Sequence, residues 1–129
     1  MRPRRTVQAG AVLAALVEAG GFRSAQDIYM RLRAGGRSIG LSTVYRHLQS
    51  LAVQGEADVI RTSDGEATYR YCQTQGVHHH HLVCRRCGRA EEVEDRPVER
   101  WASAVAERFG YTDVDHVVEV FGTCGDCSA

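Results

Sequence analysis

Four of the five cysteines form two Cys-x-x-Cys pairs, Cys84/Cys87 and Cys124/Cys127. A pair at this spacing lets two thiolates bind one ion from a tight turn, and two pairs complete a tetrahedral sulfur site. The chain shows no apolar leader and no run that would span a membrane, so we expect a cytoplasmic protein with reduced thiols. The pattern predicts a structural Zn²⁺ held by these four cysteines. The alternative is four buried thiols without metal.

A run of four histidines, His78 to His81, ends three residues before Cys84. In an extended segment, alternate side chains point to opposite faces. His78 and His80 would then share one face, and His79 and His81 the other, so one strand can serve two sites. A purification tag is the first alternative, but this run is short, internal and followed by Leu-Val-Cys. A solvated polar loop is the second.

Other metal-binding residue types lie elsewhere in the chain. Glu99 falls on an expected helix, His116 at the start of the last expected strand, Cys72 where the two halves join, and Asp58 on an expected hairpin. An isolated histidine such as His116 is ordinarily a core or surface residue, and only these other donors make it a candidate. The residues alone leave open which partner joins which histidine pair.

The first half of the chain has the order of a winged helix-turn-helix. Apolar residues at helical spacing predict helices over 7–19, from Ser24 and from Ser42, and Ser24 begins a capping-box pattern. Two alternating segments, 57–62 and 67–72, flank Asp64-Gly65, a strong hairpin signal. In this fold the third helix enters the major groove. Its outward residues would be Thr43, Tyr45, Arg46, His47 and Gln49. A solvated polar helix face is the alternative.

The net charge of zero hides a difference between the halves. Residues 1–72 carry ten arginines and six acidic residues, whereas residues 73–129 carry six arginines and ten acidic residues. This asymmetry favours an anionic partner for the first half only.

The second half predicts a small sheet with one helix. Strands are expected over 80–84, 90–94 and 116–123, and a helix begins at Asp95-Arg96-Pro97 with proline in its first turn. That helix carries an apolar stripe at Val98, Trp101, Ala102, Val105 and Phe109. So small a sheet has exposed edges and little core, which pairing across a two-fold axis would cover. We therefore expect a homodimer.

Three stretches together resemble the ferric uptake regulator family of bacterial metal sensors, over essentially the whole length. They are the third-helix stretch 41–48 (Leu-Ser-Thr-Val-Tyr-Arg-His-Leu), the block 78–88 from the histidine run to Gly88, and the closing 121–127 (Phe-Gly-Thr-Cys-Gly-Asp-Cys). Within the family, the all-histidine block and the preceding Cys72 are most similar to zinc uptake regulators of actinobacteria.

The resemblance implies an α+β fold: a winged helix-turn-helix over 1–72, a hinge linker over 73–77 and a small α/β dimerisation domain over 78–129. It implies a zinc-responsive repressor that binds double-stranded operator DNA as a metal-loaded homodimer and controls zinc uptake and homeostasis genes. Each subunit would hold one structural and one or two regulatory Zn²⁺ ions. It also assigns ligands: a hinge site of Asp58, Cys72, His79 and His81, and a dimerisation-domain site of His78, His80, Glu99 and His116. The DNA-facing residues would be Thr43, Tyr45 and Arg46.

Several other functions fit part of these features. A sensor of iron, manganese, nickel or peroxide on the same scaffold is the nearest, but a cysteine among two histidines and a carboxylate favours zinc. A zinc hydrolase would need an open coordination position and a placed base, which four protein donors per site do not leave. A thiol redox protein would use the Cys-x-x-Cys pairs themselves. We expect no enzymatic activity, no small-molecule substrate and no membrane partner.

Overall fold

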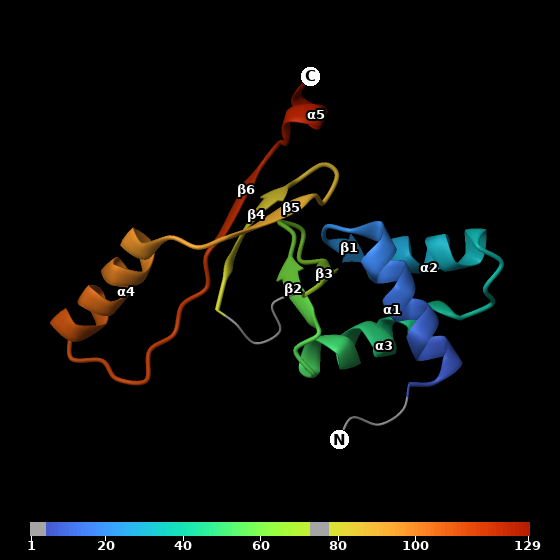
Figure 1. Cartoon of the computed structure of the whole chain (residues 1–129), viewed down its shortest axis with the longest axis horizontal. Helices are drawn as coiled ribbons and strands as arrows, with labels where there is room; N and C mark the ends of the chain where they lie inside the picture. Colours follow the sequence, from blue (N-terminus) through green and yellow to red (C-terminus); the bar gives the residue numbers. More distant parts are fainter. Residues whose placement is uncertain (1–4, 73–77) are drawn as a thin grey trace.

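The computed structural model describes residues 5–72 and 78–129, so the hinge linker expected over 73–77 lies outside the described residues. Figure 1 shows the helices and strands in chain order. They are α1 (Val7–Ala19), β1 (Arg23–Ser24), α2 (Ala25–Ala34), α3 (Leu41–Val53), β2 (Ala57–Arg61), β3 (Ala67–Tyr71), β4 (His80–Cys84), β5 (Ala90–Val93), α4 (Arg96–Arg108), β6 (Glu119–Gly122) and α5 (Gly125–Ser128). We call residues 5–72 the head.

Polar caps fix where the first two helices begin. The hydroxyl of Thr6 accepts a hydrogen bond from the Ala9 amide at 3.0 Å, and the hydroxyl of Ser24 accepts one from the Asp27 amide at 3.0 Å. Each cap satisfies a backbone donor that has no partner within the helix. The capping box expected at Ser24 is confirmed at its hydroxyl, and α2 follows directly.

The core of the head orients the third helix. Val44 and Leu48 of α3 are fully buried against α1 and α2, together with Tyr69 of β3. Apolar residues three and four positions apart lie on one side of a helix, so burying them turns the intervening polar residues outward. The result is a three-helix unit with α3 presented on its surface, followed by a hairpin. The winged helix-turn-helix expectation is confirmed.

The described residues form two three-stranded sheets, one in each half of the chain. The head contains the order β1-β3-β2, all antiparallel, and the second half contains β5-β4-β6, in which β4 pairs antiparallel with β5 and parallel with β6. The last strand was expected over 116–123, but β6 begins only at Glu119. His116 instead lies in the segment before it, because that segment turns toward α4. The short β1 and α5 were not expected from the sequence.

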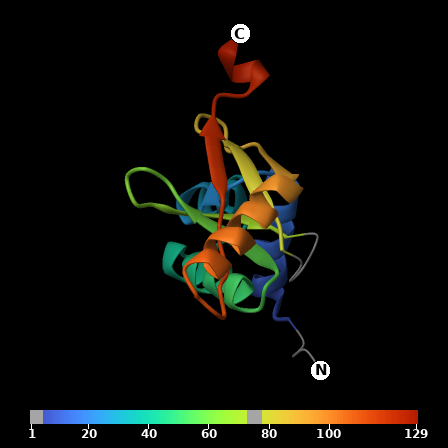
Figure 2. The ribbon, with the colours of Figure 1, turned by 90° about the vertical axis from the view of Figure 1, so that its left-hand side faces the viewer.

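Helix α4 stands apart from the head on the far side of the second sheet (Figures 1 and 2). None of its residues is buried within the chain, although it carries the expected apolar stripe. Trp101 is 67% exposed and Phe109 is 65% exposed. Among the described residues, no helix is both long enough and apolar enough to cross a membrane.

Candidate metal centres

The two Cys-x-x-Cys turns meet at one end of the second sheet. The sulfur atoms of Cys84, Cys87, Cys124 and Cys127 all lie within 4.8 Å of one another. Cys87 Sγ and Cys124 Sγ are 3.8 Å apart. A Zn–S bond of about 2.3 Å places two sulfurs of a tetrahedron about 3.8 Å apart. The parallel pairing of β4 with β6 brings the second turn beside the first, and the four sulfurs fit a tetrahedral zinc ion.

Electrostatics at this cluster favour a bound cation. Backbone amides, first that of Cys124, donate to Cys84 Sγ and lower the pKa of this thiol to about 6. The hydrogen bond with the Cys124 sulfur, together with burial, raises the pKa of the Cys127 thiol to about 12. Four sulfurs this close cannot all ionise without a positive charge among them, and Zn²⁺ would supply that charge.

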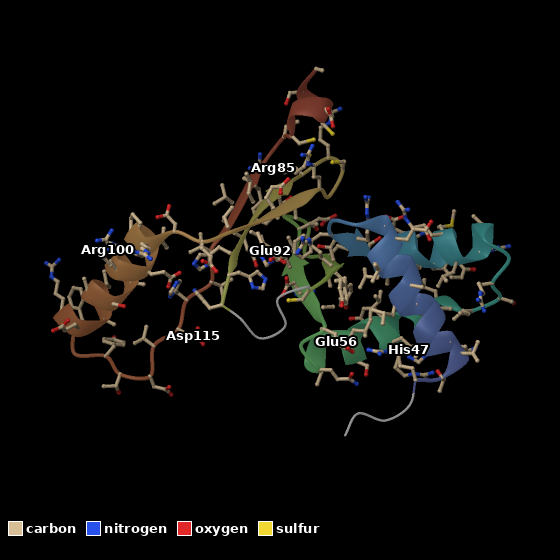
Figure 3. The ribbon with its side chains drawn as sticks, in the orientation of Figure 1. His47, Glu56, Arg85, Glu92, Arg100 and Asp115 are labelled. Carbon is tan, nitrogen blue, oxygen red and sulfur yellow. The ribbon has the colours of Figure 1, made fainter. Side chains whose placement is uncertain are left out.

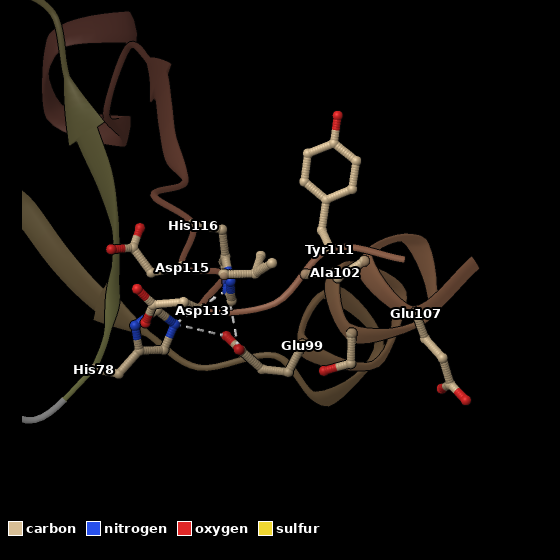
Figure 4. A pocket seen from close by; sticks show the side chains of 11 residues that line it. His78, Glu99, Ala102, Glu107, Tyr111, Asp113, Asp115 and His116 are labelled. Carbon is tan, nitrogen blue, oxygen red and sulfur yellow. Dashed lines mark hydrogen bonds and ion pairs between the residues drawn. The ribbon is translucent and has the colours of Figure 1, made fainter. Parts of the chain in front are cut away.

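A second cluster joins the histidine run to α4. Glu99 accepts from His80 Nε2 at 2.7 Å and lies 3.0 Å from both His78 Nε2 and His116 Nε2. The Nε2 atoms of His78 and His116 are themselves 3.1 Å apart. Figure 4 shows His78, Glu99 and His116 converging from three segments. Donors on one tetrahedral zinc ion lie about 3.3 Å apart, so these four groups need little movement to bind it.

A third cluster joins the head to the second sheet. Asp58 of β2 lies 2.9 Å from His79 Nε2 and 2.9 Å from His81 Nε2. Asp58 belongs to the head, whereas both histidines belong to the segment that enters and forms β4. An ion bound by all three would therefore tie the two sheets together.

Both carboxylates of these clusters are held ionised. Burial alone would raise the pKa of Asp58, but hydrogen bonds from His81 and His79 outweigh it and lower the pKa to about 2. Desolvation likewise opposes ionisation of Glu99, and hydrogen bonds from His80, His116 and His78 lower its pKa to about 2. A carboxylate that is already charged loses no proton when a metal ion binds.

The alternation expected of the histidine run is present in the structure. His78 and His80 meet Glu99 on one side, and His79 and His81 meet Asp58 on the other. Cys72, the fourth hinge residue implied by the resemblance, follows β3 and is 2% exposed. It is not among the residues whose donor atoms all lie within 4.8 Å of one another, so its place in the hinge site stays a prediction.

The sequence model of the ferric uptake regulator family matches residues 2–121. The chain belongs to this family. A zinc uptake regulation protein of Mycobacterium tuberculosis is 50% identical over 124 residues, which are 96% of this chain and 94% of that protein. Ferric uptake regulator family membership, expected from three motifs, is thus confirmed.

Solved structures of the ferric uptake regulator family share this fold. The crystal structure of FurB from M. tuberculosis, a zinc uptake regulator, has 50% sequence identity and a TM-score of 0.54, covering 93% of this chain and 92% of that one. A zinc uptake regulator complexed with zinc and DNA has 30% identity and a TM-score of 0.72, covering 97% of this chain and 83% of that one.

The outer face of α3 carries the residues that the resemblance places against DNA. Tyr45 and Arg46 are exposed there, and Thr43 is half-buried. Gln49 Nε2 donates to the Tyr45 hydroxyl at 2.9 Å, one helical turn away. Burial and the nearby Tyr45 raise the pKa of Tyr69, which lies beneath this face. Tyr45 thus accepts a hydrogen bond from Gln49 on its own helix and lies close to Tyr69 of β3. Sequence reasoning placed Gln49 outward but did not find its contact with Tyr45.

Proposed function

We propose that this protein is a zinc-responsive transcriptional repressor that binds operator DNA as a metal-loaded homodimer and controls genes of zinc uptake and homeostasis. One observation carries the proposal: a carboxylate of the head converges with two histidines of the second sheet. A single ion at this point would fix the angle of the DNA-binding head. The names of the relatives support zinc as that ion and DNA as the partner.

The proposed ligand sets follow the three clusters. The structural ion would be held by Cys84, Cys87, Cys124 and Cys127. The hinge ion would be held by Asp58, Cys72, His79 and His81, and a further ion by His78, His80, Glu99 and His116. The units that these ions stabilise or connect would be a winged-helix DNA-binding domain over 1–72, which contains the head, a linker over 73–77 and a dimerisation domain over 78–129. Thr43, Tyr45 and Arg46 would face the DNA.

Zinc would act as a ligand of the DNA-competent arrangement. In a dimer, the angle of each head sets the distance between the two α3 helices, which must match half-sites one helical turn or a multiple apart on the duplex. A bound metal ion restricts the orientations that each head samples. Less of the free energy of DNA binding is then lost when DNA selects one of these orientations. A cysteine beside two histidines and a carboxylate makes zinc the preferred ion over iron or manganese.

The dimer would form through the second half of the chain. The apolar face of α4 is exposed and borders a groove of about 340 Å³. The residues lining this groove are Trp101, Ala102, Val105, Ala106, Phe109, Tyr111 and Val114. Exposed apolar surface of this kind is ordinarily covered by a partner. The family is one of transcription regulators, and we infer that the protein acts in the cytoplasm and catalyses no reaction.

The direct test is DNA binding across buffered free zinc, with iron and manganese titrated in parallel. The DNA would first be selected by the zinc-loaded protein from a random pool. Binding that switches on at free zinc far below the effective iron or manganese concentration supports the proposal. Binding that ignores metal, or that responds first to iron or manganese, would refute it.

A further inference from the structure

The turn that carries the first cysteine pair, residues 84–88, touches the head through its backbone. The Phe22 amide donates to the Gly88 carbonyl at 2.7 Å. A β-carbon on Gly21 would lie 2.4 Å from that carbonyl oxygen, and one on Gly88 would lie 2.3 Å from the Phe22 oxygen. Both glycines also have positive φ, +64° and +79°. Only glycine at both positions allows the two backbones to approach this closely.

Apolar side chains close the interface around this hydrogen bond. Phe22 and Ile60 of the head are buried with Val83 of β4, and Phe121 of β6 packs against them. The Phe22 ring also meets the His81 ring edge-on, with centroids 5.1 Å apart. Head and second sheet thus share a small core of their own. The interface thus buries apolar residues of β2, β4 and the loop before β1, and β6 packs against them.

An ion pair flanks the interface. Arg70 Nη1 donates to Glu92 Oε1 at 2.8 Å, and both side chains are largely buried. Arg70 lies opposite Asp58 in the β2–β3 ladder, and Glu92 lies opposite His81 in the β4–β5 ladder. The ion pair therefore runs beside the contact between Asp58 and His81. Figure 3 labels Glu92 where the second sheet passes the head.

We propose that the turn over 84–88 is a docking site that holds the head at this one contact without an ion in the hinge cluster, so that a hinge ion restricts only the motion about this contact. Cys84 and Cys87 belong to the same turn as Gly88. The cluster of Cys84, Cys87, Cys124 and Cys127, which we call the sulfur centre, therefore sets the position of the Gly88 carbonyl that accepts the hydrogen bond from the Phe22 amide. The sulfur centre then has two roles: it stabilises the second half of the chain and it anchors the head at one point. This docking needs no ion in the hinge cluster, because it uses only contacts between protein groups and the sulfur centre.

Two adjacent glycines give a matched pair of variants. Gly20 has φ +61°, and no atom of the described residues lies within 4 Å of its added β-carbon, whereas Gly21 has φ +64° and faces the Gly88 carbonyl. Both substitutions place a side chain at a positive φ, so Gly20→Ala is the control for that strain, and only Gly21→Ala should separate the head from the turn. The readouts are hydrogen exchange of the Phe22 amide and small-angle X-ray scattering, on the full chain with zinc at its sulfur site.

We expect Gly21→Ala to speed Phe22 amide exchange at least tenfold relative to Gly20→Ala and to increase the radius of gyration. Zinc content at the sulfur site should be the same in both variants. Asp58→Ala, which removes a hinge donor, should leave the Phe22 amide protected within threefold of the parent protein. Equal exchange in the two glycine variants would overturn the proposal, as would loss of protection in Asp58→Ala.

The ion pair provides a second route if Gly21→Ala does not fold. Arg70→Glu should expose the Phe22 amide, and adding Glu92→Arg should restore at least part of its protection. If the double variant exchanges as fast as Arg70→Glu alone, the ion pair does not hold the head, and the docking proposal fails at this contact.

Discussion

His81 Nε2 lies 2.9 Å from Asp58 Oδ2, and this contact joins strand β4 of the second sheet to strand β2 of the head. Asp58 also lies 2.9 Å from His79, so one carboxylate faces two imidazoles. Such an arrangement places three donors where a single ion can bind them. Of these three donors, only the Asp58 carboxylate comes from the head. Substituting Asp58 is therefore the most direct test of the hinge site.

Asp58→Ala should remove zinc-switched DNA binding while leaving the sulfur centre loaded. We expect the free zinc needed for half-maximal DNA binding to rise by roughly 100-fold or more, since even groups that only orient a ligand contribute 10–100-fold. Fluorescence anisotropy with a selected operator across buffered zinc measures this. Asp64→Ala is the control, because Asp64 lies at the exposed tip of the same hairpin and outside the cluster. An unchanged zinc midpoint in Asp58→Ala would refute the hinge assignment.

Cys72→Ser tests whether a thiolate completes the hinge site. Cys72 is buried immediately after β3, close in sequence to the histidine run. Serine has nearly the same size but supplies an oxygen, which is a harder donor than sulfur. The hinge site should then no longer bind zinc more tightly than manganese or iron. We expect zinc-dependent DNA binding to be abolished in a protein that remains dimeric, measured by anisotropy and by light scattering. Wild-type metal preference in Cys72→Ser would exclude the thiolate from the site.

Cys84→Ser or Cys124→Ser should unfold the second half of the chain. A structural zinc ion contributes its binding free energy to folding, and three remaining sulfurs hold the ion less tightly. Circular dichroism, gel filtration and zinc content measure the loss. Cobalt(II) titration adds a spectroscopic check, because tetrahedral thiolate coordination gives intense absorption that each substitution should weaken. Soluble, dimeric Cys84→Ser protein would show that the four cysteines are not the structural centre.

The positions of the helices and of the histidine pairs could be predicted because they depend on local periodicity. Val44 and Leu48 follow the helical period and are buried, and the two-residue period of an extended chain separates His78 and His80 from His79 and His81. Both patterns are properties of neighbouring residues, so one sequence is enough to reveal them.

Contacts between distant segments could not be predicted in the same way. Gly20 is the C-cap of α1, whereas Gly21 is needed where the chain passes Gly88, a contact that the sequence analysis did not predict. The one feature of the sequence that could have indicated this contact is the second glycine of the Gly20-Gly21 pair. The ion pair of Arg70 and Glu92 had no such indication, since two charged residues 22 positions apart in the sequence look like two solvated side chains. The start of β6 was misplaced because alternation continues through His116, which instead turns toward Glu99.

Trp101→Glu should separate the dimer. Trp101 lies on the exposed apolar face of α4, and burying an aromatic side chain of this size contributes about 3 kcal/mol, roughly 100-fold in affinity. A buried carboxylate at its place would add a desolvation cost. Light scattering at micromolar concentration should find monomer. Arg100→Glu, one residue earlier on the same helix, is the control and should stay dimeric. A dimeric Trp101→Glu protein would mean that subunits pair through another surface.

Operator DNA should tighten zinc binding by the same factor by which zinc tightens DNA binding. This equality is required if both ligands favour one arrangement of the heads, because a coupling free energy is reciprocal. Zinc affinity is measured by competition with a chelator, with and without selected operator at saturation. A DNA of scrambled sequence is the control for general charge effects, since the basic first half attracts any polyanion. Equal zinc affinity with operator and with scrambled DNA would mean that metal binding and operator binding are uncoupled, and the hinge cluster would then serve stability alone.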